Sequence, residues 1–207
     1  MFYEILDKKR INILPKLAYF KDEYYLAGGT ALALQIGHRD SIDFDFFKKE
    51  DVDTNSLFFK LKKVLSPQKV YKINENLNTL DVLIDNEINL SFFSYKYPLI
   101  EKIKKEDNLS LASILDIACM KLSAILSRAS NKDYIDLYYI FKDYSLSLVL
   151  DAFKNKYQDT DINIVLKSLV YFEDVEIEPI MFSPGKELSF DEVKDFLIQV
   201  VKDYKKF

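Results

Sequence analysis

The sequence predicts an α+β protein: a small mixed sheet with flanking helices in residues 1–108, followed by a C-terminal helical bundle in residues 109–207. Two observations lead to this prediction. The first half contains short apolar runs that alternate with polar residues and are separated by Asn-rich turns, as strands are. From Ser113 onward the spacing of apolar residues favours helices, interrupted by a loop that contains Pro179, Pro184 and Gly185.

The first element with a chemical signature is the turn Gly28-Gly29, which precedes a short apolar helix predicted over Ala31–Ile36. Paired glycines let the main chain approach a phosphate closely, and a helix that starts after them directs its free N–H groups at such an anion. Thr30 adds a hydroxyl group. Taken alone, however, a glycine pair is also typical of an ordinary turn.

The next element, Ser41–Phe46, alternates as a strand with one buried face. In a strand, Asp43 and Asp45 share the polar face with Ser41, whereas the apolar side chains between them enter the core. Two carboxylates about 7 Å apart on one face repel each other unless a divalent cation lies between them. The alternative is that both are simply solvated on the outer face of the sheet.

The remaining elements follow from the same patterns. We predict one further helix in the first half at 57–65, strands at 69–73, 79–84 and 87–93, and later helices at 113–128, 132–142, 146–157, 161–172 and 190–205. The last helix begins with a capping box, in which Ser189 is followed three residues later by Glu192.

Lys121 lies on a helix whose neighbouring positions are almost all apolar. A lysine in such surroundings either extends to water or meets an anion, since an unpaired buried ammonium group is costly. A phosphate site elsewhere in the chain favours the anion. On the following helix, Asp136 is a surface residue, a structural partner of Lys121 or Arg128, or a functional carboxylate; periodicity leaves these three open.

Three further residues are interpreted by their type and position. Arg39 is expected on the polar face of the strand with Asp43, where it can pair with a carboxylate or bind a phosphate. His38 is the only histidine of the chain, so a His-rich metal site is excluded. Cys119 is the only cysteine and is expected to be a buried apolar filler.

Composition sets outer limits on function. With 207 residues, 49% of them hydrophobic, the chain can bury about 70% of its unfolded surface. No apolar run is long enough for a membrane span and the start does not resemble a secretory signal, so we expect a cytoplasmic protein. The net charge of −4 argues against non-specific coating of nucleic acid. Lysine clusters at 60–63, 102–105 and 202–206 are solvated faces or local contacts for RNA.

Four segments in order resemble one known family. Leu26–Leu34, Gly37–Phe47, Asp116–Ile125 and Arg128–Tyr138 are similar to the motifs of the AbiEii/AbiGii-type nucleotidyltransferase toxins, members of the DNA polymerase β-like nucleotidyltransferase superfamily. The likeness extends from about residue 24 to residue 142, and the remaining C-terminal part carries no recognisable signature.

The resemblance implies a polymerase β-like core and a metal-dependent enzyme that transfers a nucleoside monophosphate from a nucleoside triphosphate to an acceptor hydroxyl, with RNA or tRNA as the expected acceptor. It further implies a toxin opposed by a cognate antitoxin. By the same likeness, Gly28, Gly29 and Thr30 hold the triphosphate, Asp43 and Asp45 bind Mg²⁺, and Lys121 and Asp136 complete the site, with Arg39 near the phosphates.

One departure from the superfamily concerns a third carboxylate on a neighbouring strand. Ser91 stands where that acid is expected, and Asp81 and Asp85 are the possible substitutes; Asp136 is a further candidate for the general base. This departure favours an alternative function, that of a catalytically silent protein of the same fold that binds a nucleotide or a partner. A metal-dependent nuclease would use the same carboxylates but explains neither the glycine turn nor Lys121.

Overall fold

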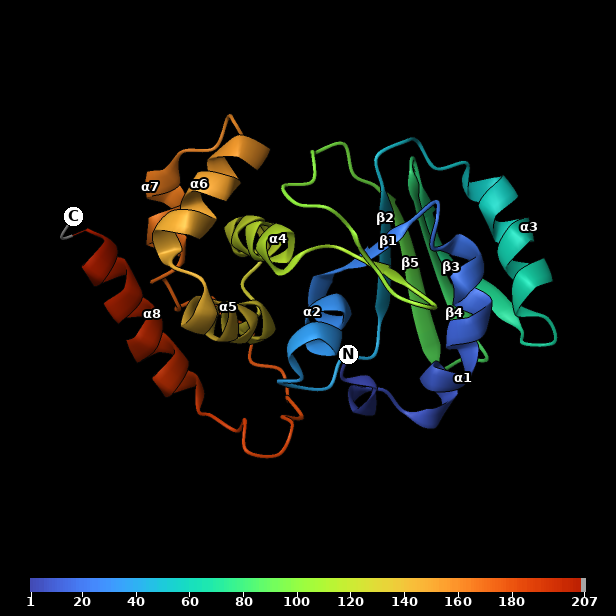
Figure 1. Cartoon of the computed structure of the whole chain (residues 1–207), viewed down its shortest axis with the longest axis horizontal. Helices are drawn as coiled ribbons and strands as arrows, with labels where there is room; N and C mark the ends of the chain where they lie inside the picture. The colour runs from blue at the N-terminus through green and yellow to red at the C-terminus, as the bar shows by residue number, and fades with distance from the viewer. Residues whose placement is uncertain (206–207) are drawn as a thin grey trace. The chain divides into compact units, whose positions relative to one another are not determined.

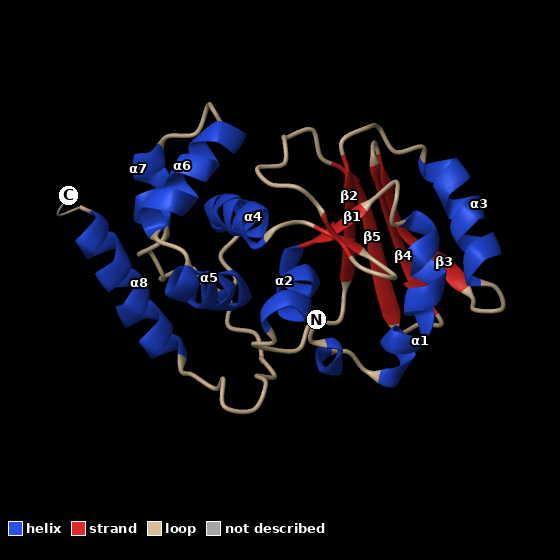
Figure 2. Cartoon of the chain, in the orientation of Figure 1, coloured by secondary structure: helices blue, strands red, loops and turns tan. Residues whose placement is uncertain are grey.

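The computed structural model describes residues 1–205 of the chain, which form two compact units. Unit 1 comprises residues 1–98 and 102–112, and unit 2 comprises residues 99–101 and the chain from Ser113 onward. Figure 2 shows the division of structure between them: the strands belong to unit 1, and unit 2 is built from helices and loops.

Unit 1 is organised around one mixed sheet with the strand order β3-β4-β5-β2-β1-β7-β6. The two central strands, β2 and β5, run parallel, whereas β1 and β4 pair antiparallel to them. The strands are β1 (Tyr25–Ala27), β2 (Phe44–Lys48), β3 (Val70–Asn76), β4 (Thr79–Ile84), β5 (Ile88–Ser94), β6 (Lys104–Lys105) and β7 (Ser110–Leu111).

One face of this sheet is the core of unit 1. Phe44, Phe46 and Phe92 are fully buried there, and the ring of Phe46 stacks with those of Phe44 and Phe92. Helices α1 (Lys8–Leu17) and α3 (Thr54–Leu65) lie on this side, with the 3-10 turns η1 (Tyr3–Ile5) and η2 (Ala18–Phe20) beside α1 in the chain (Figure 1). Burial of these aromatic rings removes a large apolar area from water, which stabilises the sheet.

The opposite face of the sheet carries more polar side chains. Because side chains alternate along a strand, the buried positions Phe44 and Phe46 turn Asp45 and Phe47 to this second face, where both are half-buried. Helix α2 (Gly28–Ile36) lies on the same side of the sheet, across from α1 and α3 (Figure 1). We call this second face the open face.

Unit 2 contains the helices α4 (Ile114–Ser127), α5 (Asn131–Asp143), α6 (Leu146–Lys156), α7 (Ile162–Ser168) and α8 (Phe190–Tyr204). Side-chain caps begin four of these helices, which satisfies backbone N–H groups that would otherwise lack a partner. The predicted capping box of Ser189 and Glu192 is present at the start of α8.

The structure confirms the predicted mixed α/β fold and differs from the prediction in details. Helix α1 and the short strands β1, β6 and β7 were not predicted from periodicity. The helix after the glycine turn begins at Gly28, and β2 begins at Phe44, so Asp43 lies just before the strand. The predicted domain boundary was at 108/109, whereas the two compact units divide at 112/113, with residues 99–101 in unit 2.

Candidate functional site: a glycine turn and two carboxylates

The glycine turn stands at the junction of β1 and α2. Gly28 has φ +72°, a left-handed conformation that favours glycine, and the helix begins without a side-chain cap from its N-cap residue Ala27. The first N–H groups of α2 therefore receive no hydrogen bond from the side chain of the N-cap residue, and a helix start of this kind can bind an anion. The first turn carries no acidic residue that would repel one.

Asp45 lies directly against this turn. A Cβ placed on Gly28 would meet Asp45 Oδ2 at 3.0 Å, and Ala27 pairs with Asp45 in the β1–β2 ladder. The absence of a side chain at position 28 therefore leaves room for the Asp45 carboxylate beside the main chain. The predicted proximity of the glycine turn to one of the two carboxylates is what the structure shows.

Asp43 lies two residues before Asp45, and its exposed carboxylate accepts a hydrogen bond from Asn89 Nδ2 at 3.0 Å. Asn89 belongs to β5, the strand beside β2, and precedes Ser91, the cross-strand partner of Asp45. Asn89 was missed in the sequence, because its position beside Asp43 follows from strand pairing and not from spacing along the chain.

Thr30 takes part in holding the carboxylate segment. It is 1% exposed, its hydroxyl donates to the carbonyl oxygen of Asp43, and its Oγ1 lies 2.8 Å from Ser41 Oγ. These contacts tie helix α2 to the chain immediately before β2. Thr30 thus positions this segment, and its contact with a phosphate stays a prediction.

Arg39 is not on the strand, contrary to the prediction that it shares a strand face with Asp43. It is buried between α2 and β2, where its guanidinium donates to the carbonyl oxygen of Asp40 at 2.9 Å. One guanidinium nitrogen lies 2.6 Å from the position that a Cβ on Gly29 would occupy. Burial raises the pKa of the Asp40 carboxyl, and the charge of Arg39 opposes this in part.

The position of the third acid is defined by the strand register. Asp45 on β2 pairs with Ser91 on β5, which in turn pairs with Asp81 on β4. Asp81 therefore lies on the open face, two strands from Asp45 or about 10 Å away, and accepts a hydrogen bond from Asn74. Asp85 lies in the β4–β5 turn, where it accepts from the backbone N–H of Lys69. Of the two substitutes, only Asp81 shares the row of Asp45.

In unit 2, Lys121 meets carboxylates of its own chain. Its ammonium group lies 2.7 Å from Asp133 and 2.6 Å from Asp136, and all three side chains are buried. Arg128 adds a second cation, with its Nε 3.2 Å from Asp133. The anion expected for the buried lysine is therefore present in the protein, and Asp136 is a structural partner of Lys121.

Asp133 was not singled out in the sequence. It lies three residues before Asp136 on α5, and residues at that spacing share a helix face, so the signal was available once Lys121 was recognised. The structure brings together Gly28, Gly29, Thr30, Arg39 and the two carboxylates within unit 1, and it brings together Lys121 and Asp136 within unit 2.

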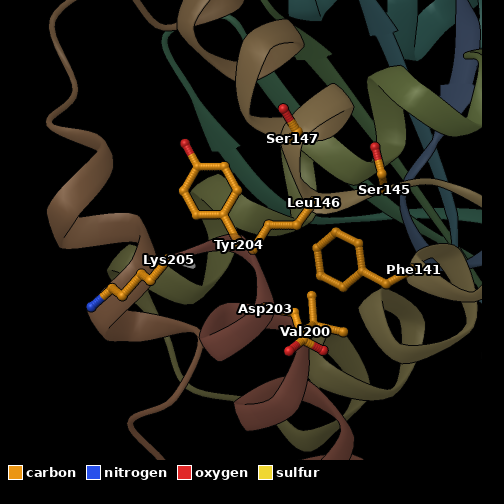
Figure 3. Close-up of a pocket in the computed structure, with 8 residues that line it drawn as sticks. All are labelled: Phe141, Ser145, Leu146, Ser147, Val200, Asp203, Tyr204 and Lys205. Atoms are coloured by element: carbon orange, nitrogen blue, oxygen red, sulfur yellow. The ribbon is translucent and has the colours of Figure 1, made fainter. Parts of the chain in front are cut away.

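A pocket of about 690 Å³ lies elsewhere in unit 2, and its lining includes Phe141, Leu146 and Val200 (Figure 3). It is formed by residues from the end of α5, the start of α6 and the C-terminal part of α8. No residue of the predicted site lines it.

The carboxylates can be tested against the needs of a metal ion. Within residues 1–205, no group of three or more His, Cys, Asp or Glu side chains is arranged to hold one. Asp43 and Asp45 nevertheless supply the oxygen ligands that Mg²⁺ prefers, and this ion is commonly held by one or two carboxylates together with substrate phosphates. The donor set therefore fits a magnesium ion that binds with its nucleotide.

Comparison with known families assigns the chain. The family model described as the nucleotidyl transferase AbiEii toxin of type IV toxin–antitoxin systems matches residues 49–203. The chain belongs to the AbiEii family. The AbiEii match covers most of the chain and includes Lys121 and Asp136, but it begins after the glycine turn and the two carboxylates.

Relatives extend the AbiEii assignment. A protein of Aquifex aeolicus described as uncharacterized is 39% identical over 189 residues, which covers 88% of each chain. The fold is similar to that of MenT4, a nucleotidyltransferase toxin from Mycobacterium tuberculosis (TM-score 0.61, 13% identity, 94% of this chain and 82% of that one). It is also similar to that of JHP933 from Helicobacter pylori (TM-score 0.59, 17% identity, 97% and 95%).

The structural likeness covers the parts of the chain that the AbiEii model omits, because these matches span nearly the whole sequence. A more distant match is the Megavirus polyadenylate synthase, with a TM-score of 0.50, 15% identity and coverage of 66% of this chain and 32% of that one. The protein is thus a nucleotidyltransferase of the AbiEii toxin family with the fold expected from the sequence. Among the described residues 1–205, we find no helix long and apolar enough to cross a membrane.

Proposed function

We propose that this protein is a magnesium-dependent toxin that transfers a nucleoside monophosphate from a nucleoside triphosphate to a hydroxyl group of an RNA acceptor, with tRNA as the first candidate. The observation that carries the proposal is the contact of Asp45 with the Gly28 turn at the uncapped start of α2. A phosphate-binding main chain and a metal-binding carboxylate are thus neighbours on one side of the sheet.

The residues of unit 1 have separate proposed roles in binding the triphosphate and the metal ion. The N–H groups at the start of α2 bind the triphosphate, and Gly28 keeps the space between that anion and Asp45 open. Asp43 and Asp45 would hold the ion, with Asn89 orienting Asp43 and Thr30 fixing the segment between α2 and β2. When bound, the ion would neutralise charge on the transferred phosphoryl group.

The oxygen of the acceptor hydroxyl attacks the α-phosphorus of the triphosphate. The bond from that phosphorus to the oxygen that bridges it to the β-phosphorus breaks, and pyrophosphate leaves. The hydroxyl proton passes to a base. Asp81 is the carboxylate of the open face that we propose for this step, through an intervening water, because it shares the row of Asp45.

Lys121 and Asp136 are proposed as functional residues on the strength of the family resemblance. Their mutual ion pair, shared with Asp133, also supports the fold of unit 2. Loss of activity on removal of Lys121 could therefore reflect either a lost functional group or a destabilised unit 2. Asp43 and Asp45, which are not fully buried, give a cleaner test.

The test compares Asp43→Asn and Asp45→Asn with wild type in a transfer assay that contains labelled nucleoside triphosphates, total RNA, and either Mg²⁺ or a chelator. We expect each variant to lose at least about a hundredfold in rate, because charge stabilisation by a bound ion is worth several kcal/mol. Asp22→Asn, which removes the same charge from an exposed position of unit 1, is the control and should retain full activity. Undiminished transfer by both site variants would refute the mechanism.

The same variants test the toxin function in cells. Expression of the wild-type chain should arrest growth, and a cognate antitoxin should relieve the arrest; Asp43→Asn should grow normally at equal protein level. A variant that blocks transfer in the assay but still arrests growth would separate the toxicity from nucleotide transfer.

The serine at position 91 supports a second candidate, a silent protein that binds a nucleotide without turnover. Ser91 occupies the place beside Asp45 in which an acid would complete a three-carboxylate site. Calorimetry with each triphosphate distinguishes the two candidates, because binding without any labelled product would favour the silent protein.

A further inference from the structure

The open face of unit 1 bears a row of aromatic rings next to the row of carboxylates. Tyr25, Phe47 and Phe93 are cross-strand neighbours on β1, β2 and β5. The ring centroids of Tyr25 and Phe47 are 6.0 Å apart and those of Phe47 and Phe93 are 5.1 Å apart, each pair stacked at 25°. This aromatic row lies on the same sheet face as Asp45, two residues further along β2, or about 7 Å away.

The row ends at a small residue. The cross-strand neighbour of Phe93 on β4 is Thr79, so the stack of rings does not continue onto the next strand. Because one face of the Phe93 ring stacks on Phe47, its other face is turned toward the Thr79 side. Phe93 and Thr79 are both half-buried, so each keeps some exposed surface at this end of the row.

Phe47 is held in place by its surroundings. Besides its two stacked neighbours it meets Tyr95 edge to face, with centroids 5.6 Å apart, and Tyr95 in turn contacts Tyr97. Because Phe93 stacks on this fixed ring, it offers a preformed stacking surface, and little side-chain freedom is lost when a planar ligand binds.

The position of the row relative to the carboxylates points to one occupant. The glycine turn borders Asp45 from the β1 side, and a triphosphate held there occupies that side. The attacking and leaving oxygens lie roughly in line on opposite sides of the transferred phosphorus. The acceptor therefore approaches from the β5 side, which is the strand that carries Ser91 and Phe93.

We propose that the free face of the Phe93 ring stacks on a nucleobase at the end of a single-stranded RNA acceptor, with Thr79 as the small residue that leaves room for it. The inference rests on the proposed nucleotide transfer and extends it to the way in which the acceptor is held. Stacking of this kind tolerates any base, so it predicts an acceptor site that recognises an unpaired end more than a sequence.

The chain has no tryptophan, which permits a direct test. Phe93→Trp places a single indole at the proposed stacking position, and Phe59→Trp places one on the surface of α3, where the native ring is 71% exposed. Each variant is titrated with a short single-stranded RNA, a nucleoside triphosphate with Mg²⁺, and inorganic tripolyphosphate, and its tryptophan fluorescence is recorded.

We expect the RNA to quench Phe93→Trp strongly and Phe59→Trp hardly at all, because quenching by a base requires contact with the indole. Tripolyphosphate, which has charge but no base, should quench neither variant. Quenching of Phe93→Trp by the triphosphate and not by RNA would overturn the assignment and place the donor base there. Absence of quenching by either ligand would overturn the stacking site as a whole.

A kinetic experiment keeps the inference independent of the tryptophan variant. Phe93→Leu preserves the apolar packing against Phe47 but removes the aromatic face. The KM for the RNA acceptor should therefore rise about tenfold, because the loss of one base–aromatic stacking contact weakens binding by about that factor. The KM for the triphosphate should not change. An unchanged KM for RNA in an active Phe93→Leu enzyme would contradict the stacking site but not the nucleotide transfer. If RNA quenches the fluorescence of Phe93→Trp but the wild-type protein transfers no nucleotide, only the proposed function is contradicted.

Discussion

At the scale of single residues, the two glycines of the site, Gly28 and Gly29, have different surroundings and different roles. Gly28 needs its left-handed backbone and also the empty volume beside Asp45, whereas the space beside Gly29 is filled by the guanidinium of Arg39. A sequence shows both as glycines in a turn. Only the neighbours in space distinguish the one that borders the carboxylate from the one that is covered by a buried arginine.

The role of Gly28 can be isolated because the chain contains a matched position. Gly185 has φ +76° and no atom within 4 Å of an added Cβ, whereas Gly28 has φ +72° and Asp45 Oδ2 at 3.0 Å. Alanine at either position should cost about 1–2 kcal/mol in the free energy of unfolding, the cost of a left-handed conformation for a residue with a Cβ. Gly28→Ala alone should also lose nucleotide transfer, because the added methyl group displaces the Asp45 carboxylate.

Urea unfolding and the transfer assay on both alanine variants measure these two effects separately. Normal nucleotide transfer by Gly28→Ala would mean that the close approach of Gly28 to Asp45 is not required for activity. Impaired transfer by Gly185→Ala would mean that the loss reflects general destabilisation.

At the scale of elements, buried ion pairs connect the helices of unit 2. Asp116 at the start of α4 and Lys156 at the end of α6 are both fully buried, with their charged atoms 2.8 Å apart. The Asp116 carboxylate also accepts from the backbone N–H groups of Ile100 and Glu101 and from the Ser113 hydroxyl. One carboxylate thus connects two helices and the segment 99–101, which explains why that segment belongs to unit 2.

Removal of the cation from this network should be costly. Lys156→Met leaves Asp116 buried without its charged partner, and we expect a loss of about 3–5 kcal/mol in the free energy of unfolding. Lys154→Met, at an exposed position of the same helix, should change it by less than about 0.5 kcal/mol. Urea unfolding followed by circular dichroism measures both; equal stability of the two variants would show that the buried pair contributes nothing.

At the scale of the whole molecule, the two units have separate cores, and the single thiol of the chain reports on one of them. Cys119 lies on α4 and is fully buried in unit 2. Burial raises the pKa of the Cys119 thiol to about 12, so the group is neutral at pH 8, and the reactive thiolate is scarce as long as unit 2 is folded.

The folded protein should therefore react very slowly with a chromogenic disulfide reagent at pH 8, and it should release one equivalent of chromophore once urea unfolds unit 2. Absorbance after mixing gives the rate, and the reaction in urea is the internal control. A native rate close to that in urea would show that α4 opens readily and that unit 2 is less stable than its buried contacts indicate.

Much of this molecule was predictable because local patterns and tertiary structure agree. Alternation predicted the strand that carries Asp45, helical spacing predicted α4 to α8, and the family motifs predicted the nucleotidyltransferase fold. Helix α1 was missed, and it contains Pro15, a residue that weakens a helical pattern. The strands β1, β6 and β7 were missed because two or three residues are too few for a period to be recognised.

The site was predictable only in part. The sequence by itself determined which residues carry the chemistry: a glycine pair, two carboxylates one residue apart, and a lysine on an apolar helix. The tertiary structure decided which partners these residues have. It paired Lys121 with Asp133 and Asp136, set Ser91 and Asp81 in one row with Asp45, and placed Phe93 beside Phe47. The physical reason is that periodicity reports which face of its own element a side chain occupies, whereas strand register and helix packing bring together residues that are distant in the chain.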